Sequence, residues 1–201
     1  MPRTSERGGP QTRERIREAA SLLFFQRGYD AVTVAEVARS AGVSSVTVFN
    51  HFPRKEDLFF DRSTDAVELL RGAIRDRAPE TDVLSALEQM SIRLVEERAP
   101  LSGVDPRSDQ FFRTVADSPA LIARAREIAA ELQTVLADEL DDDPAFTGDA
   151  SLLAALFIAG YSLMFVRTAS QVLSGVEDAV MLSDHRQRLD RLFATLRGGL
   201  G

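Results

Sequence analysis

Apolar residues recur along this chain three and four positions apart, in one stretch after another. That spacing places side chains on one face of an α-helix, whereas a strand would alternate apolar and polar residues. We find no strand-like alternation of any length and no internal repeat. The sequence therefore predicts an all-α fold of about nine helices.

Breaks rich in Gly, Pro and Asp separate the expected helices. The segment from Thr33 to Phe52 is expected to hold two short helices joined by a tight turn. The other helices are expected at residues 12–27, 54–77, 82–98, 109–115, from 119 to an acidic loop at 138–148, 149–173 and 183–197.

The first short helix in the Thr33–Phe52 segment ends at Gly42, because glycine can adopt the left-handed conformation that closes a helix. Ser44 is a suitable N-cap for the second helix, and Val48 and Phe52 repeat on its inner side. The inner face of the first helix is formed by Val34, Val37, Ala38 and Ala41. The segment thus has the pattern of two packed short helices.

The second short helix has a polar side that faces away from its apolar residues. The polar residues on that side are Ser45, Thr47, Asn50 and His51. A helix-turn-helix that binds DNA requires such a pair, with the second helix exposed along one side. The pattern alone also permits an ordinary hairpin of two helices.

Charge is distributed unevenly along the chain, whose net charge is −7. Residues 1–55 contain nine Lys and Arg against five Asp and Glu, and the remainder contains 15 against 26. A basic module that meets DNA, joined to a larger acidic body, would show this asymmetry. Residues 1–11 are expected to form a flexible basic arm, residues 12–53 the DNA-binding domain and residues 54–201 the body.

The composition argues against several other classes of protein. With 44% hydrophobic and 27% charged residues, the 201-residue chain is expected to be globular. It has no cysteine and two histidines, so disulfides are excluded and a metal site is not expected. The acidic run 141–143 does not fit a calcium-binding loop, and no phosphate-binding loop or nucleophile motif occurs. We therefore expect no catalytic residues, no metal and no cofactor.

The chain begins without the apolar stretch of a signal peptide, so a cytoplasmic protein is expected. The longest apolar run, Leu152–Val166, is shorter than the roughly 20 residues needed to span a membrane. It is expected to be a buried helix, and no membrane is expected as a partner.

A family resemblance rests on residues that occur in a fixed order and spacing within residues 12–60. They are Ile16, Ala19, Ala20, Leu23, Phe24, Gly28, Tyr29, Thr33, Val34, Val37, Ala38, Ala41, Gly42, Val43, Ser44, Thr47, His51, Phe52, Lys55, Glu56, Asp57 and Leu58. In these residues the chain resembles the TetR family of transcriptional regulators. The body resembles the family only in the number and length of its helices.

The resemblance implies a three-helix DNA-binding module on a helical body that binds a ligand and forms a homodimer on a palindromic operator. It also implies that the second short helix faces the major groove and that Thr33, His51 and Lys55 contact phosphates. The full set of expected DNA-binding residues is Thr33, Ser44, Ser45, Val46, Thr47, Phe49, Asn50, His51 and Lys55.

Two residues depart from the family's pattern. Many relatives have tyrosine where this chain has Phe49, and glycine or another small residue where it has Val46. Both changes make the surface more apolar and suit contacts with a thymine methyl group. We therefore expect an altered base preference and retained DNA binding.

The body is expected to bind a small apolar or aromatic molecule. The expected ligand-binding residues are Phe60, Met90, Phe111, Phe112, Arg113, Tyr161, Met164, Phe165 and Arg167. Apolar side chains with a few polar groups are typical of such pockets, and Arg113 or Arg167 would anchor a carboxylate. The same residues can equally be ordinary core.

The dimer is expected to form through the helices Leu152–Leu173 and Ser183–Arg197. A helix that is apolar nearly all round requires a second covering layer, and a partner subunit would supply it. Ligand binding would shift the helix that follows the module and change the separation of two half-sites about 34 Å apart.

The sequence leaves two other functions open. One is a DNA-binding protein whose helical body binds a protein partner instead of a small molecule. The other is a helical enzyme or carrier that has kept the module.

Overall fold

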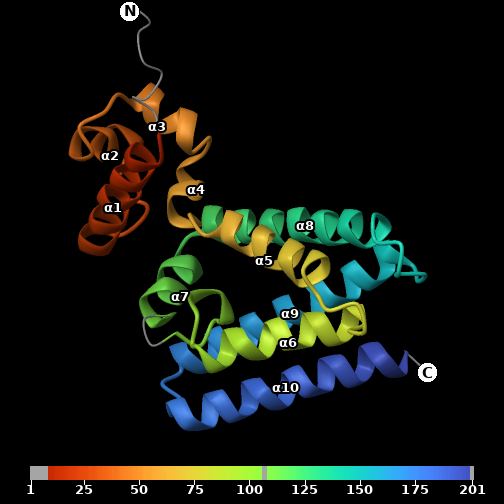
Figure 1. Ribbon diagram of the computed structural model, residues 1–201. Coiled ribbons are helices and arrows are strands. Elements are labelled where there is room, and N and C mark those ends of the chain that lie inside the picture. Colours follow the sequence, from red (N-terminus) through yellow and green to blue (C-terminus); the bar gives the residue numbers. More distant parts are fainter. Residues whose placement is uncertain (1–8, 106–107, 200–201) are drawn as a thin grey trace, which may run out of the picture.

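The computed structural model describes residues 9–105 and 108–199, and all regular structure within them is helical (Figure 1). The helices are α1 (Pro10–Arg27), α2 (Val34–Ser40), α3 (Ser45–His51), α4 (Lys55–Phe59), α5 (Ser63–Arg75), α6 (Val83–Glu96), the 3-10 helix η1 (Pro100–Ser102), α7 (Ser108–Asp117), α8 (Pro119–Asp141), α9 (Ala150–Leu173) and α10 (Asp178–Gly198). The predicted all-α fold is confirmed.

Helices α1 to α3 form a small module at one end of the molecule (Figure 1). Ile16 and Ala20 of α1 are fully buried against α2 and α3, where Val37 and Val48 are fully buried too. Apolar side chains at helical spacing on three short helices thus produce one shared core, and that core fixes the angle between α2 and α3.

The turn between α2 and α3 forms at Gly42, whose φ is 66°. This left-handed conformation is disfavoured for residues with a Cβ atom. The Val43 amide donates to the Ala38 carbonyl at 2.9 Å, which closes α2 before the chain starts α3. The predicted turn is confirmed.

Helix α1 begins two residues earlier than expected. We expected it to start at Thr12, but Pro10 takes its first turn and Gly9 stands at the cap position. Proline suits this turn because its φ is already helical and no amide is lost there. Thr12 is instead buried inside the helix. Residues 1–8 of the expected arm lie outside the described residues.

The single helix expected at residues 54–77 is wrong, because the chain forms α4 and α5 with a break between them. Arg54 stands at the cap position of α4, so the first of these helices begins at Lys55. At the break, Asp61 lies 3.5 Å from Arg17 of α1, and Phe59 stacks on Phe111 of α7 with ring centroids 5.2 Å apart. Tertiary contacts at the junction of module and body therefore override the local helical pattern.

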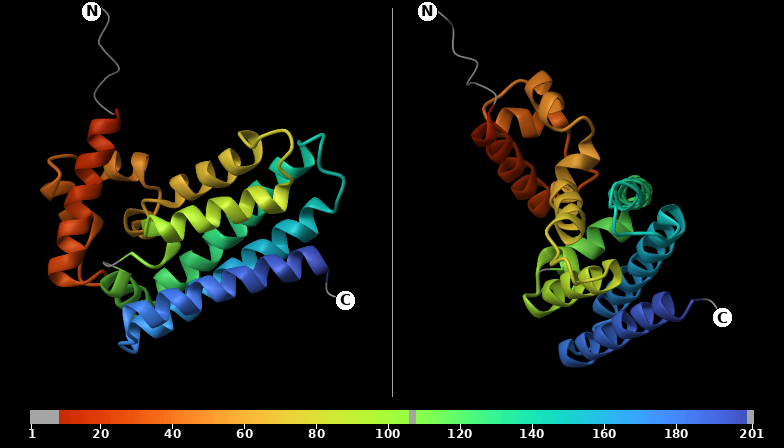
Figure 2. Two further views of the ribbon diagram at one scale, coloured as in Figure 1. Left: turned by 60° about the horizontal axis from the view of Figure 1, so that its bottom comes forward. Right: turned by 45° about the vertical axis from the view of Figure 1, so that its right-hand side comes forward.

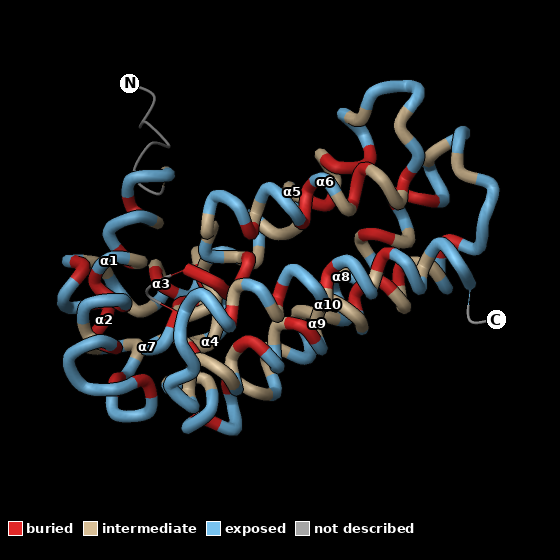
Figure 3. The backbone as a smooth tube through the Cα atoms, turned by 90° about the horizontal axis from the view of Figure 1, so that it is seen from below, coloured by how far each residue is buried: buried red, intermediate tan, exposed pale blue. Residues whose placement is uncertain are grey.

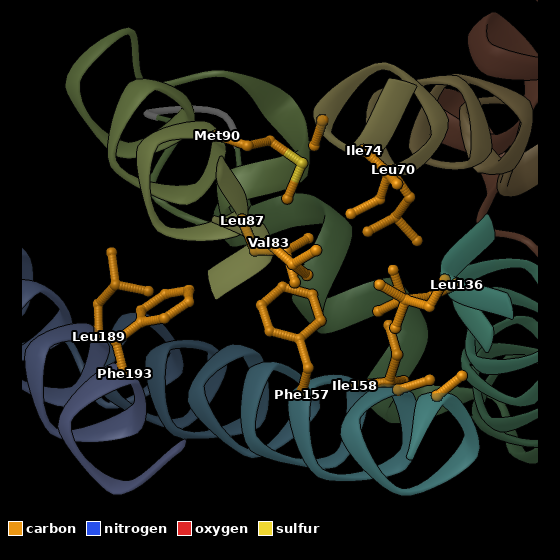
Figure 4. Close-up of a cluster of buried hydrophobic side chains, with 14 of the residues drawn as sticks. Leu70, Ile74, Val83, Leu87, Met90, Leu136, Phe157, Ile158, Leu189 and Phe193 are labelled. Atoms are coloured by element: carbon orange, nitrogen blue, oxygen red, sulfur yellow. The ribbon is translucent and has the colours of Figure 1, made fainter. Parts of the chain in front are cut away.

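The larger body consists of α5 to α10. Helix α9 packs between α8 and α10, while α5 packs against both α6 and α8 (Figures 1 and 2). The core lies among these helices, where Leu87, Leu136 and Phe193 are fully buried (Figure 4). Each such buried side chain contributes about 1.5–3 kcal/mol to the stability of the fold. The body is therefore a rigid support for the small module.

Helix α10 starts at Asp178 instead of the expected Ser183, and η1 falls at the start of the expected loop at residues 101–108. The additional turn of α10 has Met181 buried against Val95 and Val104. This small second cluster, which joins distant parts of the chain, explains the earlier start.

Helix α9 has a buried side and an exposed side, although it was expected to be buried. Phe157 is 1% exposed, whereas Leu152, Leu163 and Val166 are 55%, 59% and 64% exposed. By length and apolar composition alone α9 would be able to cross a membrane, but it packs between α8 and α10. Figure 3 shows exposed and buried segments alternating along the body helices.

Candidate DNA-binding surface

Helix α3 presents three side chains to solvent. Val46 is 69% exposed, Phe49 is 47% exposed and Asn50 is exposed, while Val48 on the opposite side is fully buried. Because residues three and four apart share a helix face, these three residues form one continuous outer surface. Ser45, Thr47 and His51 flank it and are half-buried.

Side-chain caps hold the starts of both short helices. Ser44 Oγ accepts from the Thr47 amide at 3.1 Å and lies 2.9 Å from Thr47 Oγ1. Thr33 Oγ1 accepts from the Glu36 amide at 3.3 Å, and the Glu36 carboxylate accepts from the Thr33 amide at 2.8 Å. These caps satisfy amides that a helix start leaves unpaired. Ser44, Thr47 and Thr33 therefore have structural roles beside their expected DNA contacts.

Two arginines of α1 form hydrogen bonds with backbone carbonyls at the ends of α2 and α3, which we call bracing of the helix-turn-helix. Arg13 Nη1 donates to the His51 carbonyl at 2.7 Å, and its guanidinium lies 4.1 Å from the centre of the Phe52 ring. Arg15 donates to the Ala41 carbonyl at the end of α2. Sequence reasoning missed this bracing, because charged residues on a helix surface give no sign of which carbonyl they will reach.

Lys55 lies beside α3 but is partly covered. Its Nζ is 4.1 Å from the centre of the Tyr29 ring, and desolvation lowers its pKa. The Tyr29 hydroxyl donates to Glu56 at 2.9 Å, so the ring is held in place below the ammonium group. A cation over an aromatic face is stabilised by the ring quadrupole.

Arg39 is a candidate DNA contact that sequence reasoning missed. It is exposed at the end of α2, and no hydrogen bond or ion pair is found for it among the described residues. The first helix of a helix-turn-helix crosses the DNA backbone, where a free guanidinium can meet a phosphate. The positive charge of Arg39 just before the turn could have predicted a phosphate contact from the sequence.

A row of aromatic rings connects the module to the body. The Tyr29 and Phe59 centroids lie 5.9 Å apart, Phe59 stacks on Phe111 at 5.2 Å, and Phe111 meets Phe112 at 5.7 Å. Phe112 then meets Phe165 of α9 at 5.2 Å. The row passes from the α1–α2 loop and α4 through α7 into α9, so these segments share one packed contact.

Polar bonds accompany this aromatic row. Arg124 of α8 donates to Asp57 of α4 at 2.9 Å, and Ser118 donates to Asp30 of the module at 3.1 Å. Arg54 also pairs with Glu127. The body therefore makes polar contacts with both the α1–α2 loop and the region of α4.

The expected ligand-binding residues divide into three groups. Phe60, Phe111, Phe112 and Phe165 belong to or border the aromatic row. Met90 and Met164 belong to the core cluster of the body, Tyr161 packs against it, and Figure 4 shows Met90 among its side chains. Arg113 and Arg167 are exposed, and Arg113 pairs with Asp109 at 3.0 Å. The expected polar anchors thus lie at the surface, because burial of an unpaired guanidinium is costly.

A groove of about 600 Å³ between α5 and α6 includes Met90 and none of the other expected ligand residues. Leu69 and Ala73 line it beside charged residues such as Asp76 and Arg93. The aromatic side chains of the row pack against one another and do not line this groove.

Tyr161 has an unusual environment within the core. Its hydroxyl is buried and has no hydrogen-bond partner in the part of the chain that the structure describes. Burial raises the pKa of Tyr161 to about 12. A buried unpaired hydroxyl is destabilising unless water or a ligand satisfies it.

The sequence of this chain is similar to those of known regulatory proteins. Residues 16–61 match a family described as "Bacterial regulatory proteins, tetR family". The chain is 30% identical over 99 residues to the HTH-type transcriptional regulator AcrR of Shigella flexneri, a match that spans 48% of this chain and 46% of AcrR. The match thus covers about half the length of that relative.

Two solved structures extend the similarity to the whole chain. A TetR-family regulator of Streptomyces coelicolor, SCO0857, has a TM-score of 0.61 and 19% identity, and the match covers 97% of this chain and 99% of that one. Thermus thermophilus FadR, a repressor solved with lauroyl-CoA, has a TM-score of 0.52 and 26% identity, with coverage of 88% and 92%. The fold of the body is thus shared along with that of the module.

Proposed function

The chain belongs to the TetR family of bacterial regulatory proteins, and from this we propose that it is a sequence-specific repressor which a small apolar or aromatic ligand releases from a palindromic operator. The observation that carries the proposal is the surface of α3. Val46, Phe49 and Asn50 project from a helix whose other side is locked into the module. A rigid helix with exposed side chains can enter the major groove.

The expected DNA-binding residues have separate roles in this proposal. Ser45 and Thr47 flank the exposed residues of α3, and His51 and Lys55 lie at its far end. Hydroxyl, imidazole and ammonium groups at such edges bind phosphate oxygens and fix the protein on the duplex. The base edges are then left to Val46, Phe49 and Asn50.

A homodimer accounts for the exposed side of α9. Leu152, Leu163 and Val166 repeat at intervals that return to the same helix face, and all are more than half exposed. Such an apolar stripe is costly in water unless a second copy covers it. We assign the interface to this face of α9 together with α10, which places two modules on two half-sites.

The aromatic row provides a route from the body to the module. A ligand that enters beside Tyr161 would satisfy the unpaired hydroxyl and displace core side chains, including those that support Phe165. Movement of Phe112 and Phe111 would then reach Phe59 of α4 through ring contacts. Coupling between two sites is typically worth 1–3 kcal/mol, which is enough to release an operator.

The nature of the ligand is inferred from the core and from one relative. The surroundings of Tyr161 are apolar, with Phe157 at 5.8 Å between ring centroids. FadR is described with lauroyl-CoA, a molecule with a long apolar chain. A protein partner bound to the body instead of a small molecule is the alternative function, and no described contact favours it.

We propose a cytoplasmic location, because the DNA that such a repressor binds lies there. The apolar helix α9 does not contradict this location, because its inner side packs against α8 and α10. The exposed side is assigned to the dimer.

DNA binding is tested with the purified chain and the DNA upstream of its own gene. Mobility shifts repeated across salt concentrations should give specific binding that weakens steeply as salt rises, because phosphate contacts release counterions. A scrambled duplex of the same composition measures non-specific binding.

A matched pair of variants locates the surface. Ser45→Ala combined with Phe49→Ala should lower operator affinity at least tenfold, while Leu22→Ala combined with Phe25→Ala should leave it unchanged. Leu22 and Phe25 are 54% and 68% exposed on α1, so both variants truncate exposed side chains of the module. Equal affinities for the two variants would refute the assignment of α3.

A further inference from the structure

We infer that α3 selects A·T base pairs, with Val46 and Phe49 contacting thymine methyl groups and Asn50 pairing with adenine. The inference rests on the proposed function, since it specifies the DNA that the same surface recognises. It follows from the side chains that α3 exposes and from the hydrogen bonds and ion pairs that nearby arginines form within the protein.

The two most exposed large side chains of α3 are apolar. Val46 and Phe49 are one helical turn apart and are 69% and 47% exposed. Exposed apolar side chains gain most when they meet an apolar surface. In the major groove the thymine C5-methyl group is the apolar feature that a base pair offers.

Asn50 lies on the same outer face as Val46, because the two are four residues apart. Its amide both donates and accepts, which matches the N7 acceptor and N6 donor of adenine. A thymine methyl and an adenine edge belong to the same type of base pair. The three side chains therefore favour neighbouring A·T pairs.

No charged side chain is available on α3 to read guanine. Its sequence, SVTVFNH, contains no Lys, Arg, Asp or Glu. Recognition of guanine most often uses Arg or Lys on the O6 and N7 atoms, and recognition of cytosine uses an acidic side chain on N4. A G·C pair facing Val46 or Phe49 would lose water from these polar atoms without gaining a hydrogen bond.

Four arginines of the described module and its border, namely Arg13, Arg15, Arg27 and Arg54, are already bound within the protein. Arg13 and Arg15 hold the His51 and Ala41 carbonyls. Arg27 pairs with Glu36 at 2.7 Å, and Arg54 pairs with Glu127. Arg39 has no such partner among the described residues, but it lies on α2, the helix that crosses the phosphate backbone. Within residues 9–105, the arrangement thus leaves base reading to the uncharged groups of α3.

The test begins with selection of binding sites from a random DNA pool by the full-length protein. The selected half-sites should be rich in A·T pairs at the positions that α3 covers. A duplex of the selected sequence is then compared with duplexes in which single thymines are replaced by uracil, which removes the C5-methyl group and leaves the pairing edge intact.

Replacement of a contacted thymine should weaken binding about fourfold, the effect of losing one buried methyl group. Replacement of a thymine outside the half-sites should have no effect. In Val46→Ala, uracil should no longer weaken binding at the thymine that Val46 contacts, but it should still do so at the thymine that Phe49 contacts. In Phe49→Ala the two positions should behave the other way round. Phe25→Ala, on the exposed side of α1, should keep the whole wild-type pattern and serves as the control.

Two results would overturn the inference, and they differ in meaning. Selection of a definite sequence whose α3 positions are G·C pairs, or whose thymines tolerate uracil, would refute A·T reading while leaving the proposed function intact. Failure to select any sequence, with binding equal on all duplexes, would refute both.

Discussion

At the scale of the residue, His185 shows how burial changes a side chain's chemistry. It is 1% exposed on α10, and its Nδ1 lies 2.8 Å from Thr168 Oγ1 of α9. Its Nε2 has no hydrogen-bond partner in the part of the chain that the structure describes. Desolvation, with a smaller effect of Arg188, lowers the pKa of His185 to about 4. The imidazole is therefore neutral in the folded protein at neutral pH.

This lowered pKa predicts a loss of stability in acid. Above pH 6.5 the imidazole is neutral in both states, so it causes no pH dependence. Below pH 6.5 the unfolded chain binds a proton that the folded protein does not, and the free energy of unfolding falls until about pH 4, by up to about 3 kcal/mol. Urea unfolding at pH 7, 5.5 and 4 measures this change.

His185→Gln is the matched control, because it lacks the titrating group while other acidic groups still titrate. The difference between wild type and variant should shrink in acid as the wild-type protein loses stability. Parallel pH profiles for the two proteins would contradict the assignment.

At the scale of the element, the close approach of α9 and α10 depends on Gly160. A Cβ atom built at Gly160 would lie 2.3 Å from Leu192 Cδ1 of α10, far inside normal contact. Glycine inside a helix costs about 0.5–1 kcal/mol relative to alanine, but here it makes room for a packed leucine. Helix packing thus overrides helix propensity at this position.

Replacement of Gly160 by leucine should therefore destabilise the protein by about 1–3 kcal/mol, through overpacking against Leu192. The chemical-denaturation midpoint at fixed protein concentration measures the effect. The control is Gly198→Leu at the end of α10, where an added Cβ meets no atom within 4 Å. Equal midpoints for the two variants would show that α9 and α10 are not tightly packed at Gly160.

At the scale of the whole molecule, the exposed stripe on α9 and the contacts around α4 have different tasks. In the proposed homodimer the stripe would contact a second copy, and the aromatic row joins the body to the module. A palindromic operator needs two modules at a definite separation. Both features therefore bear on how the two α3 helices would be placed on DNA.

Leu163→Glu combined with Val166→Glu should convert the proposed dimer to a monomer, because each carboxylate would have to be desolvated in the interface. Sedimentation at micromolar concentration measures the mass, and far-ultraviolet circular dichroism should remain unchanged. The operator affinity should fall at least a hundredfold, since a monomer engages one half-site.

Leu22→Glu, on the exposed side of α1, is the matched control and should sediment as the wild type does. Should the double variant remain dimeric, the interface must lie elsewhere on the body.

The helical fold was predictable from sequence, and so was the division of α3 into inward-facing and outward-facing residues. Both follow from local periodicity. The inward Val48 and Phe52 and the outward Val46 and Asn50 differ by fixed angles around a helix. The cap at Ser44 was predicted for a similar reason, since the cap and its amide are three residues apart, whereas the cap at Thr33, with the same spacing, was missed.

The break at Phe60 and the bracing by Arg13 were not predictable. Both depend on partners distant in sequence: Phe111 for the neighbouring Phe59 and the His51 carbonyl for Arg13. A local pattern records how often a residue occurs in a helix and does not record what it will meet after folding. The residues of a ligand pocket could not be predicted from sequence either, because core and pocket residues are chemically alike.

The sequence by itself determined the helical class, the tight turn at Gly42 and the inward position of Val48 on α3, because these depend on residues within one or two turns of each other. Only the tertiary structure decided which arginines were committed to carbonyls and which side chains of α3 remained free. Those outcomes depend on contacts between separate helices, and they determine which chemical groups the module can offer to DNA.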